Sequence, residues 1–252
     1  MENATTRFSN RVKEYDLYRP GYPVEVISFL MQNGLIDSNS IVAEPGAGTG
    51  KLTAMLLPVV SKVYAIEPNA PMLDVCRAQL HLHPNLECIQ ATAEDTGLPD
   101  HGMDAILAAQ AFHWFDKTAT KAEFTRIGKA GCQVILLWNE RIQAPGFMDE
   151  YDRFLVEHSN DYTEVDHRKT SYGIIAEFFR PSNMQFACLP NEQILDLKAL
   201  VGRTLSCSYM PSAKDSRWPV IQKSLEELFT KYSRNDCVSL QYATKIYYGR
   251  FN

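Results

Sequence analysis

Short apolar runs alternate with helical patterns through the first half of the chain. The apolar runs are continuous, which is typical of strands that are covered on both faces. Strands separated by helices pair in parallel, and right-handed crossovers then favour a doubly wound sheet. We therefore expect an α/β fold whose ligands bind beyond the carboxyl ends of the strands. The expected strands are 41–43, 63–66, 86–91, 103–109 and 132–138, and the expected helices are 50–57, 71–82 and 116–130.

The pattern is looser after residue 138, but no linker separates two domains. The 252 residues fit one large domain or two small ones. We favour a single domain over 1–252, with helices inserted around 140–180 and 200–218, and a separate lid domain is the alternative. The expected later helices are 146–157, 194–205 and 219–232, and the expected later strands are 184–189 and 240–248.

The charge and the cysteines narrow the class of partner and the compartment. The chain has 25 Lys and Arg against 30 Asp and Glu, a net charge of −5, which disfavours binding of bulk nucleic acid. The six cysteines form no CxxC pair, so we expect reduced thiols and a cytoplasmic protein. The N-terminal residues lack an apolar signal core, and no apolar run approaches the roughly 20 residues that cross a bilayer. His81 and His83 have no neighbouring residue to complete a metal site, so we expect no metal.

A glycine loop follows the first expected strand. Gly46, Gly48 and Gly50 let the backbone turn tightly and let a ligand approach the main chain. The dinucleotide fingerprint GxGxxG would place its third glycine where Lys51 stands. Glu44, two residues before the first glycine, would repel a diphosphate but suits a ligand that carries an ammonium group. The loop therefore favours a cationic amino-acid nucleoside over a dinucleotide.

Polar residues also follow the next three expected strands. Glu67 ends the second strand, where a carboxylate can accept hydrogen bonds from both hydroxyls of an adenosine ribose, a contact that NAD would also use. The segment 90–95 follows the third strand and would lie beside the adenine. The fourth strand is followed by 110–116, which contains a glutamine, three aromatic residues, a histidine and a helix-capping Asp116.

These four strand-end motifs, in this order, resemble those of class I S-adenosylmethionine (SAM)-dependent methyltransferases. In particular they resemble the small-molecule "type 11" methyltransferases, a group that includes relatives of trans-aconitate methyltransferase. The resemblance covers 8–140, and 15–23 resembles the N-terminal arm of the group. It implies a Rossmann-like, mostly parallel seven-stranded sheet whose last strand, 240–248, is antiparallel. It also implies SAM as cofactor, S-adenosylhomocysteine (SAH) as product, a SAM-binding core at 8–140, and acceptor-side helices and last strands at 141–252.

The resemblance assigns roles around the cofactor. Glu44 would bind the methionine ammonium, the three glycines would line the methionine and ribose, and Gln110 would lie near the sulfonium. Glu67 would bind the ribose, and the adenine would lie beside Pro68 or Asn69 and the backbone of Ala93. Thr92 stands where the family often has aspartate, which puts recognition of the adenine amine there in doubt. The residues assigned to SAM are Glu44, Gly46, Gly48, Gly50, Glu67, Pro68, Ala93, Glu94 and Gln110.

Attack on a sulfonium methyl is an in-line displacement, so the protein mainly aligns donor and acceptor and excludes water. His113 follows the fourth strand and is the candidate general base for an acceptor that must lose a proton; a structural histidine is the alternative. Trp114 is a candidate wall of the acceptor pocket, with a place in the core as the alternative. Tyr15 and Arg19 are candidates for closing over SAM or for binding an acidic acceptor, with packing at the sheet edge as the alternative. Arg141 is a further candidate for binding an anion, with surface pairing as the alternative.

The sequence favours methyl transfer from SAM to a small molecule, and Arg19, Arg141 and the trans-aconitate relatives favour an acidic metabolite. A non-catalytic SAM-binding module and, with less support, an NAD-dependent oxidoreductase are the alternatives. Methylation of nucleic acid is disfavoured, because Ala-Gln-Ala-Phe stands where an Asn/Asp-Pro-Pro-Tyr string would act on exocyclic amines of bases. No proline precedes a cysteine, so the nucleophile used for methylation of cytosine C5 is also missing.

Overall fold

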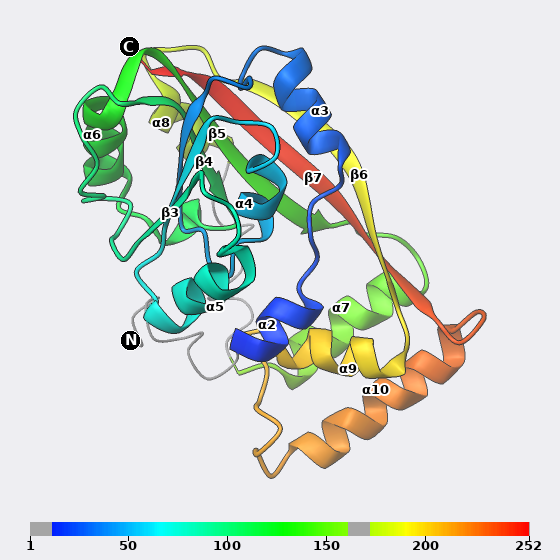
Figure 1. Ribbon diagram of the computed structural model, residues 1–252. Helices are drawn as coiled ribbons and strands as arrows, with labels where there is room; N and C mark the ends of the chain where they lie inside the picture. Colours follow the sequence, from blue (N-terminus) through cyan, green and yellow to red (C-terminus); the bar gives the residue numbers. More distant parts are fainter. Residues whose placement is uncertain (1–11, 161–171, 252) are drawn as a thin grey trace.

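A computed structural model describes residues 12–160 and 172–251 (Figure 1). Within these residues, seven strands form one sheet in the order β3-β2-β1-β4-β5-β7-β6. The strands are β1 (Ile41–Pro45), β2 (Lys62–Ile66), β3 (Leu86–Ile89), β4 (Met103–Ala109), β5 (Gly128–Arg141), β6 (Gln185–Leu195) and β7 (Val238–Phe251). The helices are α2 (Val12–Tyr18), α3 (Glu25–Gln32), α4 (Lys51–Leu56), α5 (Ala70–Leu80), η2 (Phe112–Trp114), α6 (Lys117–Ile127), α7 (Phe147–His158), α8 (Tyr172–Phe179), α9 (Leu197–Leu205) and α10 (Trp218–Tyr232).

All strands but one run in the same direction. β1 pairs in parallel with β2 and β4, β2 with β3, and β4 with β5, whereas β7 is antiparallel to both β5 and β6. The strand order reverses between β1 and β4, so the carboxyl ends of these two strands flank the crevice where a doubly wound sheet binds its ligand. The expected α/β class, the seven-stranded sheet and the antiparallel last strand are confirmed.

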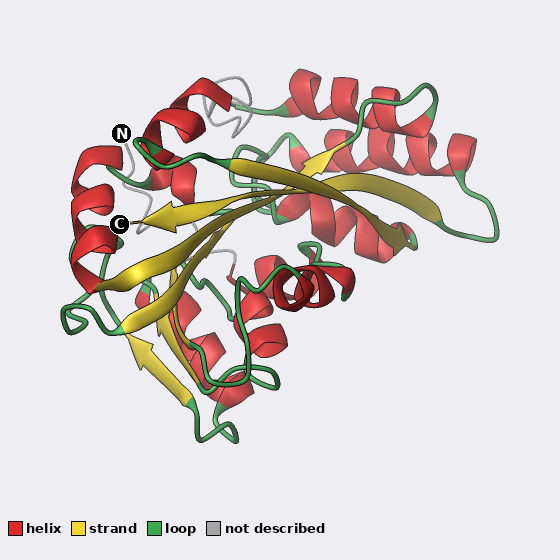
Figure 2. Cartoon of the chain, turned by 90° about the horizontal axis from the view of Figure 1, so that it is seen from above, coloured by secondary structure: helices red, strands yellow, loops and turns green. Residues whose placement is uncertain are grey.

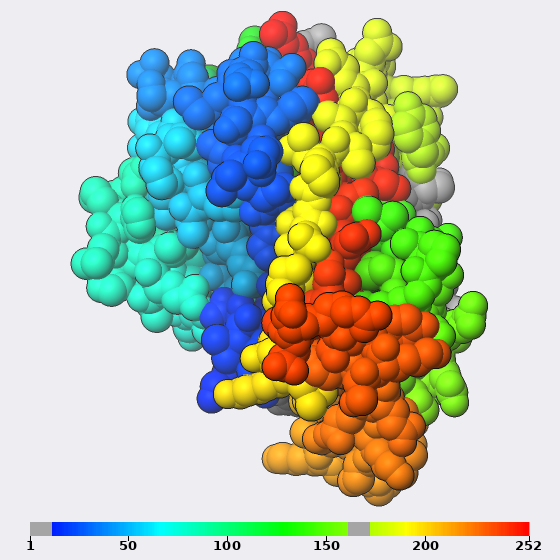
Figure 3. Space-filling model, turned by 90° about the vertical axis from the view of Figure 1, so that its right-hand side faces the viewer, coloured from blue at the N-terminus to red at the C-terminus, as the bar shows by residue number. Residues whose placement is uncertain are grey.

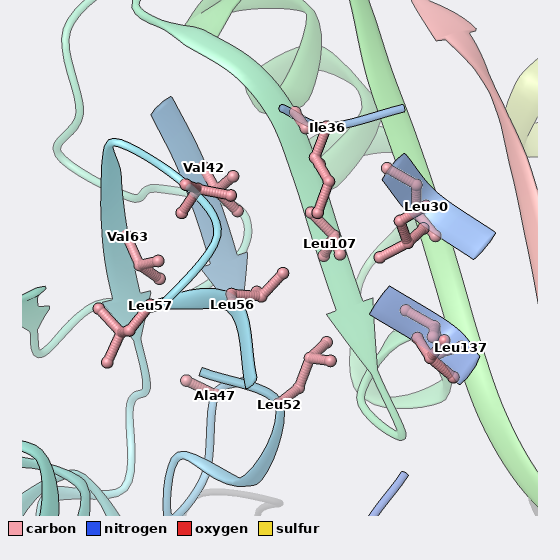
Figure 4. Close-up of a cluster of buried hydrophobic side chains, with 14 of the residues drawn as sticks. Leu30, Ile36, Val42, Ala47, Leu52, Leu56, Leu57, Val63, Leu107 and Leu137 are labelled. Carbon is pink, nitrogen blue, oxygen red and sulfur yellow. The ribbon is translucent and has the colours of Figure 1, made fainter. Parts of the chain in front are cut away.

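Two apolar clusters cover the two faces of the sheet, because side chains along each strand point alternately to opposite faces. On one face, Val42, Val63 and Leu107 pack with leucines of α3 and α4 (Figure 4). On the other face, Ile106 and Leu136 pack with aromatic residues of α6 and α8. Figure 2 shows helices on both sides of the sheet. Burial on both faces explains why the strands read as continuous apolar runs.

A third apolar cluster forms a helical layer at the end of the sheet where β6 stops and β7 starts. It consists of α7, α9 and α10 together with Leu195 of β6 and Leu240 and Tyr242 of β7. α2 packs against α9 (Figure 1). In Figure 3 the first described residues lie beside β6 and α9, while α10 covers the outside of the layer. The N-terminal arm therefore lies between the parallel part of the sheet and this helical layer.

Two predicted helix boundaries are wrong. The helix expected over 116–130 ends at Ile127, because β5 already begins with the next residue and pairs with β4 there. The helix expected over 194–205 begins only at Leu197, because β6 continues to Leu195 and still pairs with β7. In both places strand pairing extends a sheet element into residues whose local pattern favours a helix.

The insertions also differ from the prediction. The helix expected around 200–218 is confined to α9, since 206–217 form turns. Around 140–180 the structure has α7 and α8, while 161–171 of that range, like residues 8–11 of the family resemblance, lie outside the described residues. Among the described residues, no helix has the length and apolarity to span a membrane.

Candidate functional site

A cavity lies beyond the carboxyl ends of β1, β4 and β5. It is lined by Glu44, Gln110 and Asn139 from the strand ends, and by Tyr15 and Arg19 from the N-terminal arm. Residues of α9 and of the loop after it complete the lining. This is the location expected for a ligand of a doubly wound sheet.

The glycine loop joins β1 to α4 through backbone conformations that glycine adopts most readily. Gly46, Gly48 and Gly50 have φ of 76°, 58° and 86°, in the left-handed region. The amides of Gly46 and Ala47 donate to the carbonyl of Ile66, at 2.8 and 3.1 Å. A Cβ on Gly46 would lie 2.3 Å from the Cβ of Ala111, so no larger residue fits there without movement. The loop is thereby fixed between the end of β2 and the connection that follows β4.

Glu44 is a buried carboxylate at the edge of the cavity. It is 1% exposed, and the hydroxyl of Thr53 donates to its Oε2 at 2.5 Å. The pKa of Glu44 is raised to about 8: burial raises it most, the hydrogen bond from Thr53 lowers it, and the nearby Glu67 also raises it. No lysine or arginine of the described segments forms an ion pair with Glu44. A cationic group on a ligand would therefore favour the ionised carboxylate.

Glu67 holds the glycine loop from the end of β2. Its Oε2 accepts from the amide of Gly48 and its Oε1 accepts from the amide of Asn69, each at 2.9 Å. Burial raises the pKa of Glu67, and these two hydrogen bonds lower it. Each carboxylate oxygen has two acceptor positions, so one on each oxygen remains for the two hydroxyls of a ribose.

The residues predicted for the adenine end belong to the connections that follow β2 and β3. Glu94 Oε1 accepts from the amide of Asp116 at 2.8 Å, which joins the loop after β3 to the start of α6. Ala93 is buried, and the carbonyl of Pro68 accepts from the side chain of Gln90 at 3.5 Å. Within the described chain, the cavity lining contains Glu44, Gly46, Gly48 and Gln110 of the nine residues assigned to SAM. Gly50, Glu67, Pro68, Ala93 and Glu94 lie outside that lining.

Gln110 links the ends of β4 and β5. It has φ of 55°, its amide donates to the carbonyl of Leu137 at 2.9 Å, and its Nε2 donates to the carbonyl of Asn139 at 3.0 Å. Asn139 donates to the carbonyl of Gly21 at 2.9 Å and accepts from the hydroxyl of Thr244 at 2.6 Å. These bonds fasten the N-terminal arm to the strand ends that line the cavity.

His113 and Trp114 lie in η2, directly after β4, and both line the cavity. Their ring centroids are 4.9 Å apart, and Trp114 is 36% exposed. Phe112 and Phe115 of the same stretch instead pack edge to face in the core. The aromatic stretch after β4 is therefore divided between the cavity and the core.

Three of the cationic side chains that line the cavity are tied to protein oxygens. Arg141 forms an ion pair with Asp152 at 2.8 Å. Lys51 donates to the carbonyl of Asp16 at 2.6 Å, and Arg19 donates to the carbonyl of Ser206 at 3.0 Å. These contacts hold the three positively charged groups at the border of the cavity that Glu44 also lines.

Arg203 is a fourth cationic residue of the lining, and the sequence analysis missed it. It is 3% exposed on α9. A signal was present, because Leu200, Arg203 and Cys207 recur at helical spacing and so place a charge on an apolar face. That spacing does not reveal that the face borders a cavity. Tyr242 is a further lining residue that the sequence did not single out.

Comparisons with known proteins identify the domain around the cavity. A family profile described as "Methyltransferase domain" matches residues 43–136. Residues 43–136 form a methyltransferase domain. An uncharacterized methyltransferase of Mycobacterium tuberculosis is 38% identical over 143 residues, which are 57% of this chain and 56% of that protein. An uncharacterized methyltransferase-like protein of Schizosaccharomyces pombe is 32% identical over 155 residues, 61% of this chain and 59% of that protein.

The fold agrees with that of methyltransferases of known structure. A protein of Anaeromyxobacter dehalogenans, described as a proposed type II methyltransferase, superposes with a TM-score of 0.70 at 22% identity, over 92% of this chain and 98% of that chain. At this identity the similarity shows the fold alone. The chain matches less than two thirds of the length of both curated relatives. The resemblance to class I SAM-dependent methyltransferases is confirmed, and the roles of individual residues stay predictions.

The methyl donor of a methyltransferase domain of this family is SAM, and the cavity fits its amino-acid end. Glu44 is buried without a cation, which suits an ammonium group. The hydroxyl of Thr49, in the glycine loop, is buried with no hydrogen-bond partner among the described residues, as expected where a ligand completes the site. Glu44, Thr49 and the loop would hold the amino-acid part of SAM, which supplies a methyl group on a sulfonium.

Proposed function

We propose that the protein transfers a methyl group from SAM to a small-molecule acceptor. The observation that supports this most strongly is the composition of the cavity. It joins Glu44 and the glycine loop to a second set of side chains, which includes His113, Trp114 and Arg141. A cofactor site that continues into such a space can hold the donor and the acceptor in line, which is the main requirement of the reaction.

The elements around the cavity have separate parts in the proposed reaction. The N-terminal arm and the loop after α9 border the strand ends and would exclude water from the reacting groups. His113 would accept the proton of a hydroxyl or carbon-acid acceptor. A carboxylate acceptor is already ionised at pH 7 and needs no base.

We propose an acidic metabolite as the acceptor. Arg19 and Arg141 both line the cavity, as an acidic acceptor requires. The net charge of −5 argues against nucleic acid as the substrate. All six cysteines are free thiols, which supports a reducing, cytoplasmic compartment.

Calorimetric titration tests the cofactor. We expect saturable binding of SAH and SAM, and no change in fluorescence when NADH is titrated in parallel. Absence of SAH binding at millimolar ligand would refute the proposed function, and saturable NADH binding would favour an oxidoreductase.

Turnover is tested by SAH formation with SAM and a panel of small acids, alcohols and amines. We expect SAH to form with at least one acid. Tight SAM binding with no turnover across the whole panel would favour the non-catalytic SAM-binding module instead.

A further inference from the structure

Arg203 is a buried arginine that has no acidic partner among the residues that the structure describes. Its Nε donates to the hydroxyl of Tyr242 at 3.3 Å, and its Nη1 donates to Sγ of Cys207 at 2.9 Å. Neither the carboxylates nor the carbonyls of the described residues accept from Arg203, and its Nη2 has no partner among them. A guanidinium has five N–H donors, so most donors of Arg203 have no acceptor among the described residues, and the side chain lines the cavity.

The surroundings of Arg203 differ from those of Arg126 and Arg141. Arg126 pairs with Glu123, and Arg141 pairs with Asp152. The groups that interact electrostatically with Arg203 are phenols and a thiol: Tyr151, Tyr209, Tyr242 and Cys207. Burial raises the pKa of the Cys207 thiol, while the neighbouring guanidinium groups of Arg203 and Arg19 lower it. None of these neighbours is a carboxylate.

A buried guanidinium without a carboxylate is costly unless another anion completes it. The cavity is the route by which an anion can arrive, and Arg19 lines the same cavity. The Nε of Arg19 is buried without a partner in the described part of the chain. Two guanidinium groups, one from the N-terminal arm and one from α9, thus border one space with donors unused.

The position of Arg203 suits the acceptor better than the cofactor. Glu44, which suits the ammonium of SAM, belongs to β1, whereas the neighbours of Arg203 come from α7, the loop after α9, and β7. Tyr15 lies within electrostatic range of both Glu67 and Arg203, so the two regions are close neighbours. An anion at Arg203 would therefore lie beside the cofactor rather than within its binding loop.

We propose that Arg203 anchors a carboxylate of the methyl acceptor, with Arg19 as its second donor group. The proposal rests on the proposed function and extends it by naming the residue that selects the acceptor. The planar fork of a guanidinium matches the two oxygens of a carboxylate. A phosphate monoester, which carries more charge, is the competing oxyanion.

The test uses the full chain with SAH bound and a panel of probes. The panel pairs aromatic, medium-chain and dicarboxylic acids with their primary amides, and adds phosphate monoesters of similar size. Binding is measured by calorimetry and by the shift of the melting temperature. We expect the best acid to bind the wild type at least about tenfold more tightly than its amide.

Two substitutions and one control isolate Arg203. We expect Arg203→Met to raise the Kd and KM of the best acid by about thirtyfold or more, with SAH affinity unchanged. Arg203→Lys keeps the charge but loses the fork, so it should fold and still weaken acid binding by about tenfold. Arg217→Met, which removes an exposed arginine paired with Asp215, should leave both ligands unaffected.

Several results would overturn the proposal. These are equal binding of acids and amides by the wild type, tighter binding of phosphate monoesters, and loss of SAH affinity in a folded Arg203 variant. If Arg203→Met does not fold, unchanged acid affinity in Arg203→Lys has the same consequence. Failure of wild-type SAH binding would instead refute the proposed function, and acids that stabilise the protein through Arg203 without SAH would still support the anion site.

Discussion

In the proposed function, binding of the cofactor at Glu44 would be coupled to a proton. The pKa of Glu44 is raised to about 8, mostly by burial, so the unliganded protein holds a proton there at neutral pH. The ammonium of SAM or SAH requires the ionised carboxylate, and the ligand can bind below pH 8 only if that proton leaves. Binding is then linked to proton release, and affinity falls as the pH falls.

This linkage predicts the pH dependence of SAH binding. Between pH 6 and 8 we expect the affinity to rise with pH, with an upper limit of about tenfold per unit, and to level off above about 8. Calorimetry in buffers of different ionisation enthalpy should detect up to one proton released per SAH at pH 7. Glu44→Gln should bind SAH weakly with a flat profile. A wild-type affinity that is independent of pH would contradict the assignment of the ammonium to Glu44.

Glu67 accepts hydrogen bonds from the amides of Gly48 and Asn69, and the proposed function assigns its remaining acceptor positions to the ribose of the cofactor. We expect Glu67→Ala to weaken SAH binding by about tenfold or more, equivalent to about 1.4 kcal/mol. Glu87→Ala is the matched control, since Glu87 forms an exposed pair with Lys62. Equal SAH affinity in Glu67→Ala and wild type would refute the ribose assignment.

At the scale of elements, the glycine loop owes its shape to close contact as well as to backbone conformation. We expect Gly46→Ala to lower the free energy of unfolding by about 2–4 kcal/mol, since it combines left-handed strain with overpacking against Ala111. It should also weaken SAH binding, because the loop must shift. Gly34→Ala, with φ of 62° and open space at its Cβ, carries the strain alone and should cost about 1–2 kcal/mol. Equal urea midpoints for the two variants would show that the contact with Ala111 is not limiting.

Helices α2 and α9 meet at another close contact. A Cβ on Gly202 would lie 2.2 Å from the ring of Tyr18, which follows Tyr15 by one helical turn. We expect Gly202→Ala to push α2 away, lower the free energy of unfolding by about 1–3 kcal/mol, and weaken SAH binding. Gly21→Ala, in the same arm with no atom near its Cβ, should change neither quantity. Unchanged SAH affinity in Gly202→Ala would show that the cavity does not depend on how α2 is seated.

The sequence predicts elements well where the local pattern and the tertiary environment agree. β4 is predicted at its observed bounds because every residue between Ala105 and Ala108 is buried. α2 has no buried residue, so it offers no apolar stripe to detect. In the site, the glycine loop and Glu44 can be predicted from the sequence because they are neighbours along the chain and form one motif. Arg203 is not, since its importance depends on α7, α9 and β7 meeting around it.

At the scale of the whole molecule, the N-terminal arm connects the methyltransferase domain to the helical layer. The carbonyl of Asp16 accepts from Lys51 of α4, and its carboxylate accepts from Gln79 of α5. On the other side, the carbonyl of Tyr18 accepts from Gln193 of β6. The arm therefore depends on both parts of the molecule, and both depend on it to close the cavity.

β7 contributes to all three apolar clusters. Leu240 belongs to the helical layer, Ile246 to one face of the sheet, and Phe251 to the other. Because side chains of β7 pack in all three clusters, loss of packing in one cluster disturbs the strand on which the other two depend. We therefore expect the chain to unfold as one cooperative unit, in keeping with a single domain over 1–252.

Tryptophan fluorescence during urea unfolding tests this cooperativity. Trp138 packs on the face with Phe251, and Trp218 packs in the helical layer, so variants that retain one or the other as the sole tryptophan report on each region. We expect coincident midpoints, and SAH at 100 times its Kd should stabilise both signals equally, by about 2.7 kcal/mol. An earlier transition at Trp218, unmoved by SAH, would mean that the helical layer unfolds separately, and the acceptor side would then be a lid domain rather than part of one fold.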